Sequence, residues 1–474
     1  MKTLRFTIAT AMLTSVLAVN AQTSFDAAKL YDEDLNGTAR YVSMGGAMSA
    51  LGNDASVISK NPAGIGMYHH SDINTSLSFS GMAMETSPLA TLQNPKVSKD
   101  GIKYCSHNNK TDVLPSWDNI YAVFSGYDGD DSYVNFGFAY RKLLNVDFNL
   151  DYFDDQPEPD ANGRTAQRDF QDRQRNKNSS FDFNISCGLS DILYLGWTVG
   201  IVKTDTWSEG FFYDYYPEDD VNAEEYMVGV DKMNTATGSG WNMSFGAVIR
   251  PIPELRLGIA AKSPTWFKQE FDYADYLYNL PGKEFDGAKV TKMVDYKFTS
   301  PWSIDLSAGL TVMNTAFGVE FERHFAGRSY LSIDNIQMPN QGSVNFKDYS
   351  TLRVGFEQNI GKVSLRGGYN ISESLFQNNA LPYMDDSDFN INRQATDCQA
   401  IRPGKNQNFS LGLGYCSAPD SDDSQFYFDM AFVHGIRNYD FNINEWYIES
   451  AYADPTVKYN FTTNKLMFTV GWLF

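Results

Sequence analysis

The sequence lacks any long apolar run beyond its N-terminus. The stretch Phe6–Val19 is too short for a transmembrane helix, and no other part of the 474-residue chain offers the roughly 18 consecutive apolar residues that such a helix needs. The mean hydropathy is −0.38, so the chain is polar on average. These absences exclude a protein that crosses a membrane with helices.

The chain is also poor in the residues that bind metals or carry out catalysis. Its four cysteines have no CxxC spacing, and they are Cys105, Cys187, Cys398 and Cys416. Of these, Cys105 and Cys398 fall in expected outer loops, where they either form a disulfide or remain free thiols. Only five histidines are present, and the adjacent His69 and His70 cannot share one face of a strand. We therefore expect no metal, no cofactor, no catalytic residue and no enzyme activity.

Positive charge is scarce as well. The chain has 38 Lys and Arg against 58 Asp and Glu, which gives a formal net charge of −20. This balance argues against nucleic acid as a partner and favours acidic loops at a cell surface.

The N-terminus has the pattern of a secretory signal peptide. Lys2 and Arg5 precede the apolar stretch Phe6–Val19, and small residues stand before Gln22. This order predicts cleavage after Ala21, so residues 1–21 are expected to be removed on export.

Aromatic residues are abundant, and the C-terminus shows how they are arranged. Phenylalanine and tyrosine number 33 and 28. Along the last strand, apolar side chains occupy alternate positions, namely Leu466, Phe468, Val470, Trp472 and Phe474. Side chains of a strand point to opposite faces with period two, so one face of this strand meets an apolar medium. A strand of this kind with a terminal aromatic residue is typical of the closing strand of an outer-membrane β-barrel.

Similar segments recur from Asn74 onward, and their connections alternate between long and short. About fourteen strands are predicted, an even number, which favours a transmembrane antiparallel β-barrel over a soluble β-sandwich. The short turns are expected on the periplasmic side and the long loops outside. The expected strands are Asn74–Met84, Asp118–Ser125, Ser132–Phe148, Phe181–Leu189, Tyr194–Ser208, Trp241–Ile249, Glu254–Phe271, Tyr296–Leu310, Thr315–His324, Thr351–Asn359, Lys362–Ile371, Asn408–Cys416, Gln425–Ile436 and the C-terminal strand.

The segment before the first strand has no period-two alternation and is dense in small residues. The lumen of a fourteen-stranded barrel is wide enough to need filling. We therefore expect residues 22–72 to form a hatch, or plug, inside the lumen, and residues 73–474 to form the barrel.

Three short motifs lie within this expected hatch, at Ala39–Ala47, Gly52–Ser56 and Asn61–Gly64. In the third, Pro62 fixes its own φ and favours an extended Asn61, which can cap its own backbone. Gly45 and Gly46 allow a close approach of the backbone to the barrel wall. These features suit a compact plug, although such residues are also common in ordinary surface turns.

With these motifs the sequence resembles the FadL/OmpP1/TodX family of outer-membrane transporters for hydrophobic compounds. The resemblance implies a fourteen-stranded barrel with an N-terminal hatch. It also implies a ligand such as a long-chain fatty acid, which enters from outside and leaves sideways or past a shifted hatch. The residues that it assigns to the hatch or gate are Gly45, Gly46, Asp54, Asn61, Pro62, Ala63 and Gly64.

Strand alternation also predicts which charged side chains point into the lumen. The positively charged ones are candidates for binding an acidic ligand headgroup, and they are Arg141, Arg256, Lys262, Arg353 and Arg366. The acidic residues predicted to face the lumen are Asp305, Glu320, Glu322, Glu357 and Asp429. The alternative interpretation is a network of ion pairs between strands and between hatch and wall.

Aromatic clusters are expected in the outer loops, where they either capture a hydrophobic ligand or form an aromatic girdle at the membrane surface. They are Phe211–Tyr213, Tyr215-Tyr216, Trp266-Phe267 and Tyr276–Tyr278.

The sequence thus predicts a protein of the bacterial outer membrane that is in contact with its lipid and passively transports a hydrophobic small molecule. The alternative is a structural or partner-docking barrel of a secretion or surface complex, which binds a second protein through a loop such as Glu209–Ser239.

Overall fold

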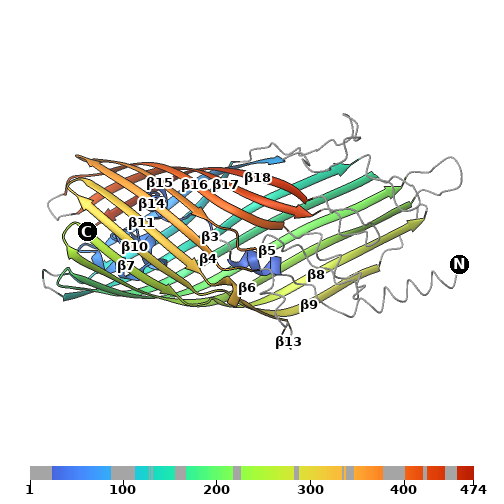
Figure 1. Cartoon of the computed structure of the whole chain (residues 1–474), viewed down its shortest axis with the longest axis horizontal. Coiled ribbons are helices and arrows are strands. Elements are labelled where there is room, and N and C mark those ends of the chain that lie inside the picture. The colour runs from blue at the N-terminus through green and yellow to red at the C-terminus, as the bar shows by residue number, and fades with distance from the viewer. Residues whose placement is uncertain are drawn as a thin grey trace.

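The fold is a closed antiparallel β-barrel (Figure 1). The computed structural model describes residues 24–31, 33–86, 113–127, 129, 132–154, 167–216, 226–281, 288–333, 336–337, 346–376, 401–419, 424–442 and 456–474. The first strand, β1 (Asp72–Thr86), pairs antiparallel with the last, β18 (Thr456–Leu473), and this pairing closes the wall. The predicted signal peptide, residues 1–21, lies outside the described residues, and so do Cys105 and Cys398.

The wall consists of fourteen strands, as predicted. Three of them are interrupted: β7 and β8 together form one wall strand, and so do β9 and β10, and β11 and β12. In the described part of the chain, the two-residue β13 pairs only with β12. The remaining elements are β2 (Leu114–Ser125), β3 (Ser132–Asp154), β4 (Gln167–Leu189), β5 (Leu193–Tyr216), β6 (Tyr226–Ile252), β7 (Leu255–Lys262), β8 (Trp266–Pro281), β9 (Ala288–Thr299), β10 (Ser303–Val312), β11 (Thr315–His324), β12 (Tyr330–Ile333), β13 (Ile336–Gln337), β14 (Tyr349–Ile360), β15 (Val363–Ser372), β16 (Ile401–Cys416) and β17 (Gln425–Asn442).

An apolar belt surrounds the outside of the barrel. On β6, Trp241, Phe245 and Ile249 point outward and are 47%, 53% and 45% exposed, whereas Asn242 and Ser244 are buried in the lumen. The C-terminal strand follows its predicted facing, since Leu466, Val470, Trp472 and Phe474 are also exposed. Exposed apolar side chains outside and polar ones inside define a wall that faces lipid.

The predicted strand ends were wrong at the end of the barrel that carries the long connections. β5 and β6 pair continuously from Leu193 with Ile249 to Tyr216 with Tyr226, so most of the predicted loop Glu209–Ser239 is strand. The aromatic runs Phe211–Tyr213 and Tyr276–Tyr278 likewise lie within β5 and β8. Beyond the lipid both faces of a strand meet water, so the alternation disappears while the hydrogen-bond ladder continues.

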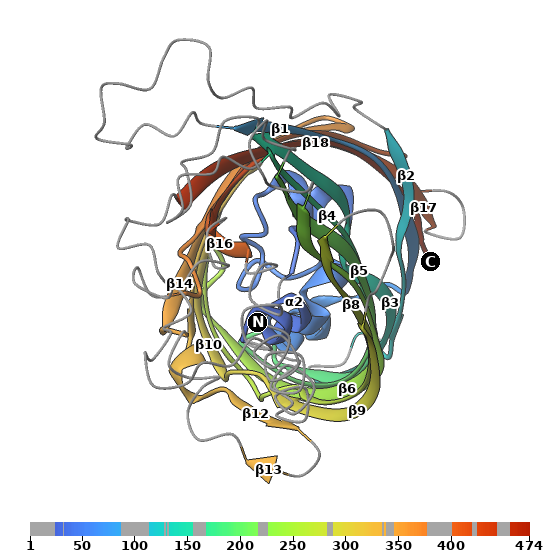
Figure 2. The ribbon, with the colours of Figure 1, turned by 90° about the vertical axis from the view of Figure 1, so that its right-hand side faces the viewer.

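The chain before β1 lies inside the barrel (Figure 2), and we call residues 24–31 and 33–70 the N-terminal segment. It contains α2 (Ser24–Tyr31), α3 (Ala39–Ser43) and the 3₁₀ helices η1 (Ala55–Ser59) and η2 (Pro62–Met67). No described helix is long and apolar enough to cross a membrane. α3 packs against β15 to β18, and η1 and η2 pack against strands between β2 and β6.

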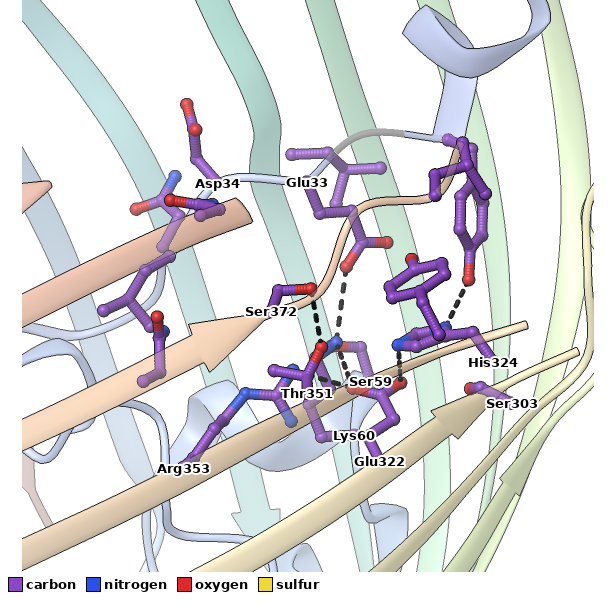
Figure 3. A pocket seen from close by; sticks show the side chains of 18 of the residues that line it. Glu33, Asp34, Ser59, Lys60, Ser303, Glu322, His324, Thr351, Arg353 and Ser372 are labelled. Atoms are coloured by element: carbon purple, nitrogen blue, oxygen red, sulfur yellow. Dashed lines mark hydrogen bonds and ion pairs between the residues drawn. The ribbon is translucent and has the colours of Figure 1, made fainter. Parts of the chain in front are cut away.

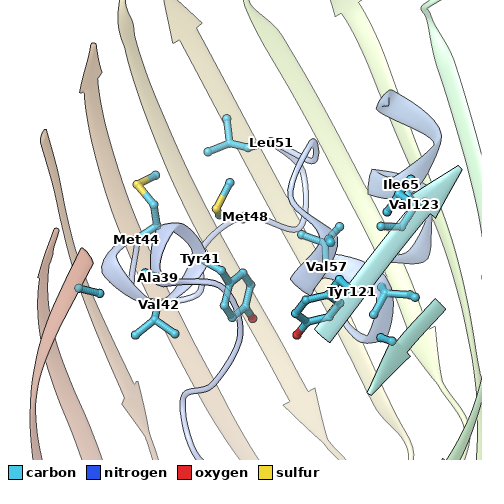
Figure 4. Packing of buried hydrophobic residues seen from close by; sticks show 14 of the residues in the cluster. Ala39, Tyr41, Val42, Met44, Met48, Leu51, Val57, Ile65, Tyr121 and Val123 are labelled. Carbon is cyan, nitrogen blue, oxygen red and sulfur yellow. The ribbon is translucent and has the colours of Figure 1, made fainter. Parts of the chain in front are cut away.

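The N-terminal segment has its own apolar core, which continues onto the wall (Figure 4). Tyr41, Met48 and Val57 of the segment are fully buried together with Tyr121 and Val123 of β2. The segment therefore folds as a compact body against the wall.

The depth of the lipid belt gives a first prediction. Phe245 lies at the middle of the lipid-facing stretch of β6, so we expect Phe245→Arg to destabilise the folded barrel by about 2–4 kcal/mol in a bilayer. Ser239→Arg, at an exposed position beyond the belt, should change stability by less than about 1 kcal/mol. Denaturant titration in lipid vesicles measures both values. Equal stability changes for the two substitutions would show that the middle of the lipid belt is not at Phe245.

Candidate functional site

The Asn61–Gly64 turn is fixed by hydrogen bonds and pressed against the wall. Asn61 caps η2, with its Oδ1 accepting from the Ala63 N–H at 3.2 Å. The Gly64 N–H donates to the Asn61 carbonyl at 3.0 Å, and the Asn61 Nδ2 donates to the Ala247 carbonyl of β6 at 3.4 Å. A Cβ added to Gly196 of β5 would lie 2.3 Å from the Pro62 carbonyl carbon, so only glycine fits there.

The other residues assigned to the hatch are also buried within the N-terminal segment. Asp54 caps η1, since its Oδ1 accepts from the Ser56 N–H at 3.0 Å and its Oδ2 from the Thr38 hydroxyl at 2.8 Å. Gly45 has φ of +63°, and a Cβ there would stand 2.7 Å from the Tyr369 nitrogen of β15. Gly46, with φ of +80°, lies over Arg353. Asp54 shapes the segment, while Gly45 and Gly46 bring it to the wall.

A first ion-pair network ties α3 to the wall. Arg40 donates to both oxygens of Glu357, with Nε at 2.9 Å and Nη2 at 3.0 Å. The same carboxylate accepts from Arg366 Nε at 2.6 Å, and Arg366 Nη1 contacts Asp429 at 2.5 Å. Glu357, Arg366 and Asp429 are all buried, so their charges are neutralised by one another and by Arg40.

A second network links the segment to β7, β11 and β14 (Figure 3). Arg353 pairs with Glu320 and, at 2.7 Å, with Glu322. Lys60 of the segment lies between two carboxylates, with its Nζ 3.3 Å from Glu322 and 3.4 Å from Glu33. Burial alone would raise the pKa of the Glu33 carboxyl, but the nearby ammonium groups of Lys262 and Lys60 hold that pKa below its usual range.

The five predicted headgroup ligands differ in what they contact. Arg353 and Arg366 are committed to the two networks, and Arg141 pairs with Asp182 at 2.5 Å. Lys262 Nζ contacts Glu33 at 3.0 Å. Arg256 donates through Nη1 to the Thr311 hydroxyl at 3.1 Å, and its buried Nε has no partner among the described residues. Only Arg141, Lys262 and Arg353 of these five line the main cavity.

This cavity lies between the N-terminal segment and the wall and has a volume of about 150 Å³. Most of the residues that line it are of polar type, and they include Glu33, Lys60, Lys262, His324 and Asn408. The charges in it have both signs. A ligand group placed here therefore meets donors and acceptors of the segment and of the wall together.

A buried apolar cluster, which we call the aromatic compartment, adjoins the cavity and is covered by α2. Residues of the wall and of α2 form this cluster: Ala27, Ala28, Leu30, Leu143, Val202, Ala236, Phe267, Phe271, Phe298, Ala326, Phe346 and Phe376. Tyr31 at the end of α2 bonds through its hydroxyl to His324 Nδ1, and the His324 ring stacks on Tyr349 with centroids 4.4 Å apart. Of the aromatic residues expected in loops, Phe267 lies here, and its neighbour Trp266 points outward.

The wall is interrupted next to the cavity, which the sequence analysis missed. Residues 263–265, 300–302 and 325–329 separate β7 from β8, β9 from β10 and β11 from β12. Ser263, Ser300 and Pro301 line the cavity. The signal was a serine followed by a proline in two predicted strands, at Pro264 and Pro301, because proline cannot donate to the ladder. The roles of Glu33, Arg40 and Lys60 were also missed.

Neither a metal site nor a known sequence relative adds to this description. Among the described residues, no group of His, Cys, Asp or Glu is arranged to hold a metal ion. No protein-family model matches the sequence, and no curated protein matches it.

The closed wall, the apolar belt and the filled lumen define an integral β-barrel protein of the bacterial outer membrane. Solved structures with the same fold cover nearly the whole chain. A Pseudomonas aeruginosa FadL homologue matches 94% of this chain and 99% of its own with TM-score 0.58 at 13% identity. The Pseudomonas putida toluene transporter TodX matches 93% and 98% with TM-score 0.52 at 12% identity. The Ralstonia pickettii toluene transporter TbuX matches 92% and 98% with TM-score 0.51 at 13% identity. The chain therefore has the fold of the FadL and TodX outer-membrane transporters, as the sequence resemblance predicted.

The Arg40–Glu357 contact gives the second prediction. Glu357→Gln leaves the guanidinium groups of Arg40 and Arg366 buried without their carboxylate, which typically costs about 3–5 kcal/mol. We expect faster hydrogen exchange in residues 33–70 while the barrel strands stay protected, measured by mass spectrometry.

The matched control for Glu357→Gln is Asp348→Asn, which removes an exposed carboxylate 3.9 Å from Arg323. Exposed pairs contribute about 0–1 kcal/mol, so exchange in the N-terminal segment should stay as in the wild type. Unchanged exchange in Glu357→Gln would show that this ion pair does not hold the segment.

Proposed function

We propose that the protein passively transports a hydrophobic small molecule across the outer membrane and that the N-terminal segment is its gate. The observation that carries the proposal is the aromatic compartment inside the lumen, which adjoins a polar cavity and is capped by α2. A hydrophobic ligand gains about 25 cal/mol for each Å² of apolar surface that such a compartment removes from water. Structures with this fold include proteins named as toluene transporters, which supports a hydrophobic cargo.

The compartment has a shape and chemistry suited to an apolar chain or ring. Phe267 and Phe298 stack with ring centroids 6.1 Å apart, and Phe346 and Phe376 meet edge to face at 5.3 Å. Ala27, Ala28 and Leu30 of α2 belong to the same buried cluster as these rings. Displacing α2 would therefore free an aromatic surface for a ligand without opening the wall.

The adjoining charges favour a ligand with a carboxylate at one end. Lys262 and Lys60 both contact Glu33, which belongs to the N-terminal segment. A ligand carboxylate that replaces Glu33 on these two ammonium groups keeps them paired and releases the segment near α2. This exchange couples binding of a fatty acid-like molecule to movement of the gate, whereas a neutral hydrocarbon would use the aromatic compartment alone.

A gate requires a segment that is firmly placed yet able to move, and here the apolar core of the segment also continues onto the wall at Tyr121 and Val123. The two ion-pair networks and the Asn61 cap provide discrete contacts that can be exchanged. Glycine positions on the wall, such as Gly196 and Gly355, lie directly under the backbone of Pro62 and Met44. The lumen is thus closed by backbone packing, and a small shift of the segment opens a path beside it.

A ligand-binding prediction tests the compartment. Phe298 is 2% exposed within the aromatic cluster, so Phe298→Ser should weaken binding of a long-chain fatty acid and of toluene by about tenfold or more. Lys262→Met should weaken binding of the fatty acid but not of toluene. Isothermal titration of the folded barrel in detergent measures both.

The control is Phe245→Ser, which removes an equally large ring from the lipid face, 53% exposed. Its affinity for both ligands should equal that of the wild type. If Phe298→Ser binds as tightly as Phe245→Ser, the aromatic compartment is not the ligand site.

A flux prediction tests the gate. Asn61→Ala with Pro62→Ala removes the cap of η2, worth about 0.5–2 kcal/mol, and the restriction on its backbone. We expect faster uptake of a fluorescent fatty acid into vesicles that contain the double variant. Asn359→Ala, which changes a capped turn between β14 and β15 away from the segment, is the control. Equal uptake by all three barrels would contradict gating by this turn.

A further inference from the structure

The outer edge of the apolar belt forms a level row on four neighbouring strands. The register pairs Phe181 of β4 with Ile201 of β5, Ile201 with Trp241 of β6, and Trp241 with Trp266 of β8. All four point outward and are 37–47% exposed. The indole rings of Trp241 and Trp266 lie 4.4 Å apart between centroids. Aromatic side chains at this position mark the boundary between hydrocarbon and head groups.

Lysines occupy the next outward-facing row, two residues beyond this edge. Lys203 of β5 pairs with Ser239 of β6, Ser239 with Lys268 of β8, and Lys268 with Lys297 of β9. These four side chains are exposed on the outside of the barrel. We call Lys203, Lys268 and Lys297 the lysine row. It stands on the strands that extend furthest beyond the belt (Figure 1).

The charge changes sign one row further out. Asp205, Glu270 and Asp295 are the outward positions two residues beyond the three lysines and lie in register with one another through Thr237. On β5, β8 and β9 the lysines therefore lie between an aromatic row and an acidic row. On β4 the exposed Lys177 is in register with Asp205, so on that strand a positive charge stands at the level of the acidic row.

Among the described residues of β16, β17 and β18, on the other side of the barrel, the first outward position beyond the belt is not a lysine. The first outward positions beyond the belt on β17 and β18 are His434 and Asn464, which bond to each other at 2.9 Å. On β16 the corresponding position is Gln407, which accepts a hydrogen bond from the Tyr369 hydroxyl at 3.0 Å. The lysine row thus marks one face of the barrel, formed by β5 to β9.

The spacing of the row favours an anion between its members. Lys268 and Lys297 are directly opposite across adjacent strands, which are about 4.8 Å apart. Lys203 stands two strands from Lys268, about 10 Å away. A phosphate at this level is within reach of the ammonium groups of the row and can accept charge-assisted hydrogen bonds from them. Each basic residue at a membrane surface contributes about 1 kcal/mol to binding of anionic lipid.

We propose that the lysine row binds the phosphate of a lipid in the outer leaflet, with the acyl chains of that lipid lying against Phe181, Ile201, Trp241 and Trp266. Continuity with the belt favours a lipid over free phosphate, because the site is completed only by chains on the apolar side. The level corresponds to the outer leaflet with the short turns facing the periplasm, as the sequence predicts. This site is on the outside of the wall and is independent of the transport proposed for the lumen.

The test compares two lipids that differ only in a phosphate. The full-length barrel in detergent is titrated with phosphatidic acid and with diacylglycerol of the same chains, and bound lipid is counted by native mass spectrometry. The wild type should prefer phosphatidic acid. The double substitution Lys203→Gln with Lys268→Gln should lower that affinity about tenfold or more, and Lys203→Arg with Lys268→Arg should retain it.

A charge-matched control separates the row from general electrostatics. Lys362→Gln with Lys405→Gln removes two exposed lysines, Lys362 from the turn before β15 and Lys405 from β16. This double substitution should leave lipid binding unchanged. Equal affinity of the row variant and the wild type would overturn the proposal. Displacement of phosphatidic acid by inorganic phosphate at the same concentration would also overturn it, since the site would then take free phosphate.

Discussion

The structure depends on one constraint, which is that no backbone donor or acceptor can be left unpaired in hydrocarbon. Pairing of β1 with β18 satisfies this constraint by removing both edges of the sheet. Closure at fourteen strands then sets the width of the lumen. The other features follow from this closed barrel: aromatic side chains cover its lipid-facing surface, and the N-terminal segment fills its lumen.

Filling the lumen creates a second physical problem, because inward side chains of a transmembrane barrel are polar. The chain solves it with carboxylates and guanidinium groups that come from both the wall and the N-terminal segment. Glu357 pairs with Arg366 of a neighbouring strand and with Arg40 of α3. The charges of the wall and of the N-terminal segment are therefore neutralised only when the two are together. The interior near α2 differs, since there five phenylalanines replace charges and pack in one cluster with Ala27, Ala28 and Leu30 of that helix.

Much of the wall could be predicted from the sequence because lipid enforces alternation. Trp241–Ile249 was assigned correctly as a strand, since one side chain in two must be apolar there. The neighbouring residues Tyr226–Gly240 were assigned to a loop, because outside lipid no such rule applies. The inward facing of Arg353 and Glu357 was predicted as well. The pairing of Arg353 with Glu320 and of Glu357 with Arg40 was not predicted, because pairing across 33 or 317 positions in sequence leaves no local pattern.

The contact of α3 with the last strand has a consequence for the order of assembly. The Ala39 N–H donates to the Thr469 hydroxyl at 2.7 Å, across 430 positions of sequence. The contact of α3 with β18 can therefore form only when the last strand is present. Contacts so distant in sequence form late. The N-terminal segment therefore lies in a barrel that is still open until β18 is added. The pairing that closes the barrel also completes the contacts of the segment.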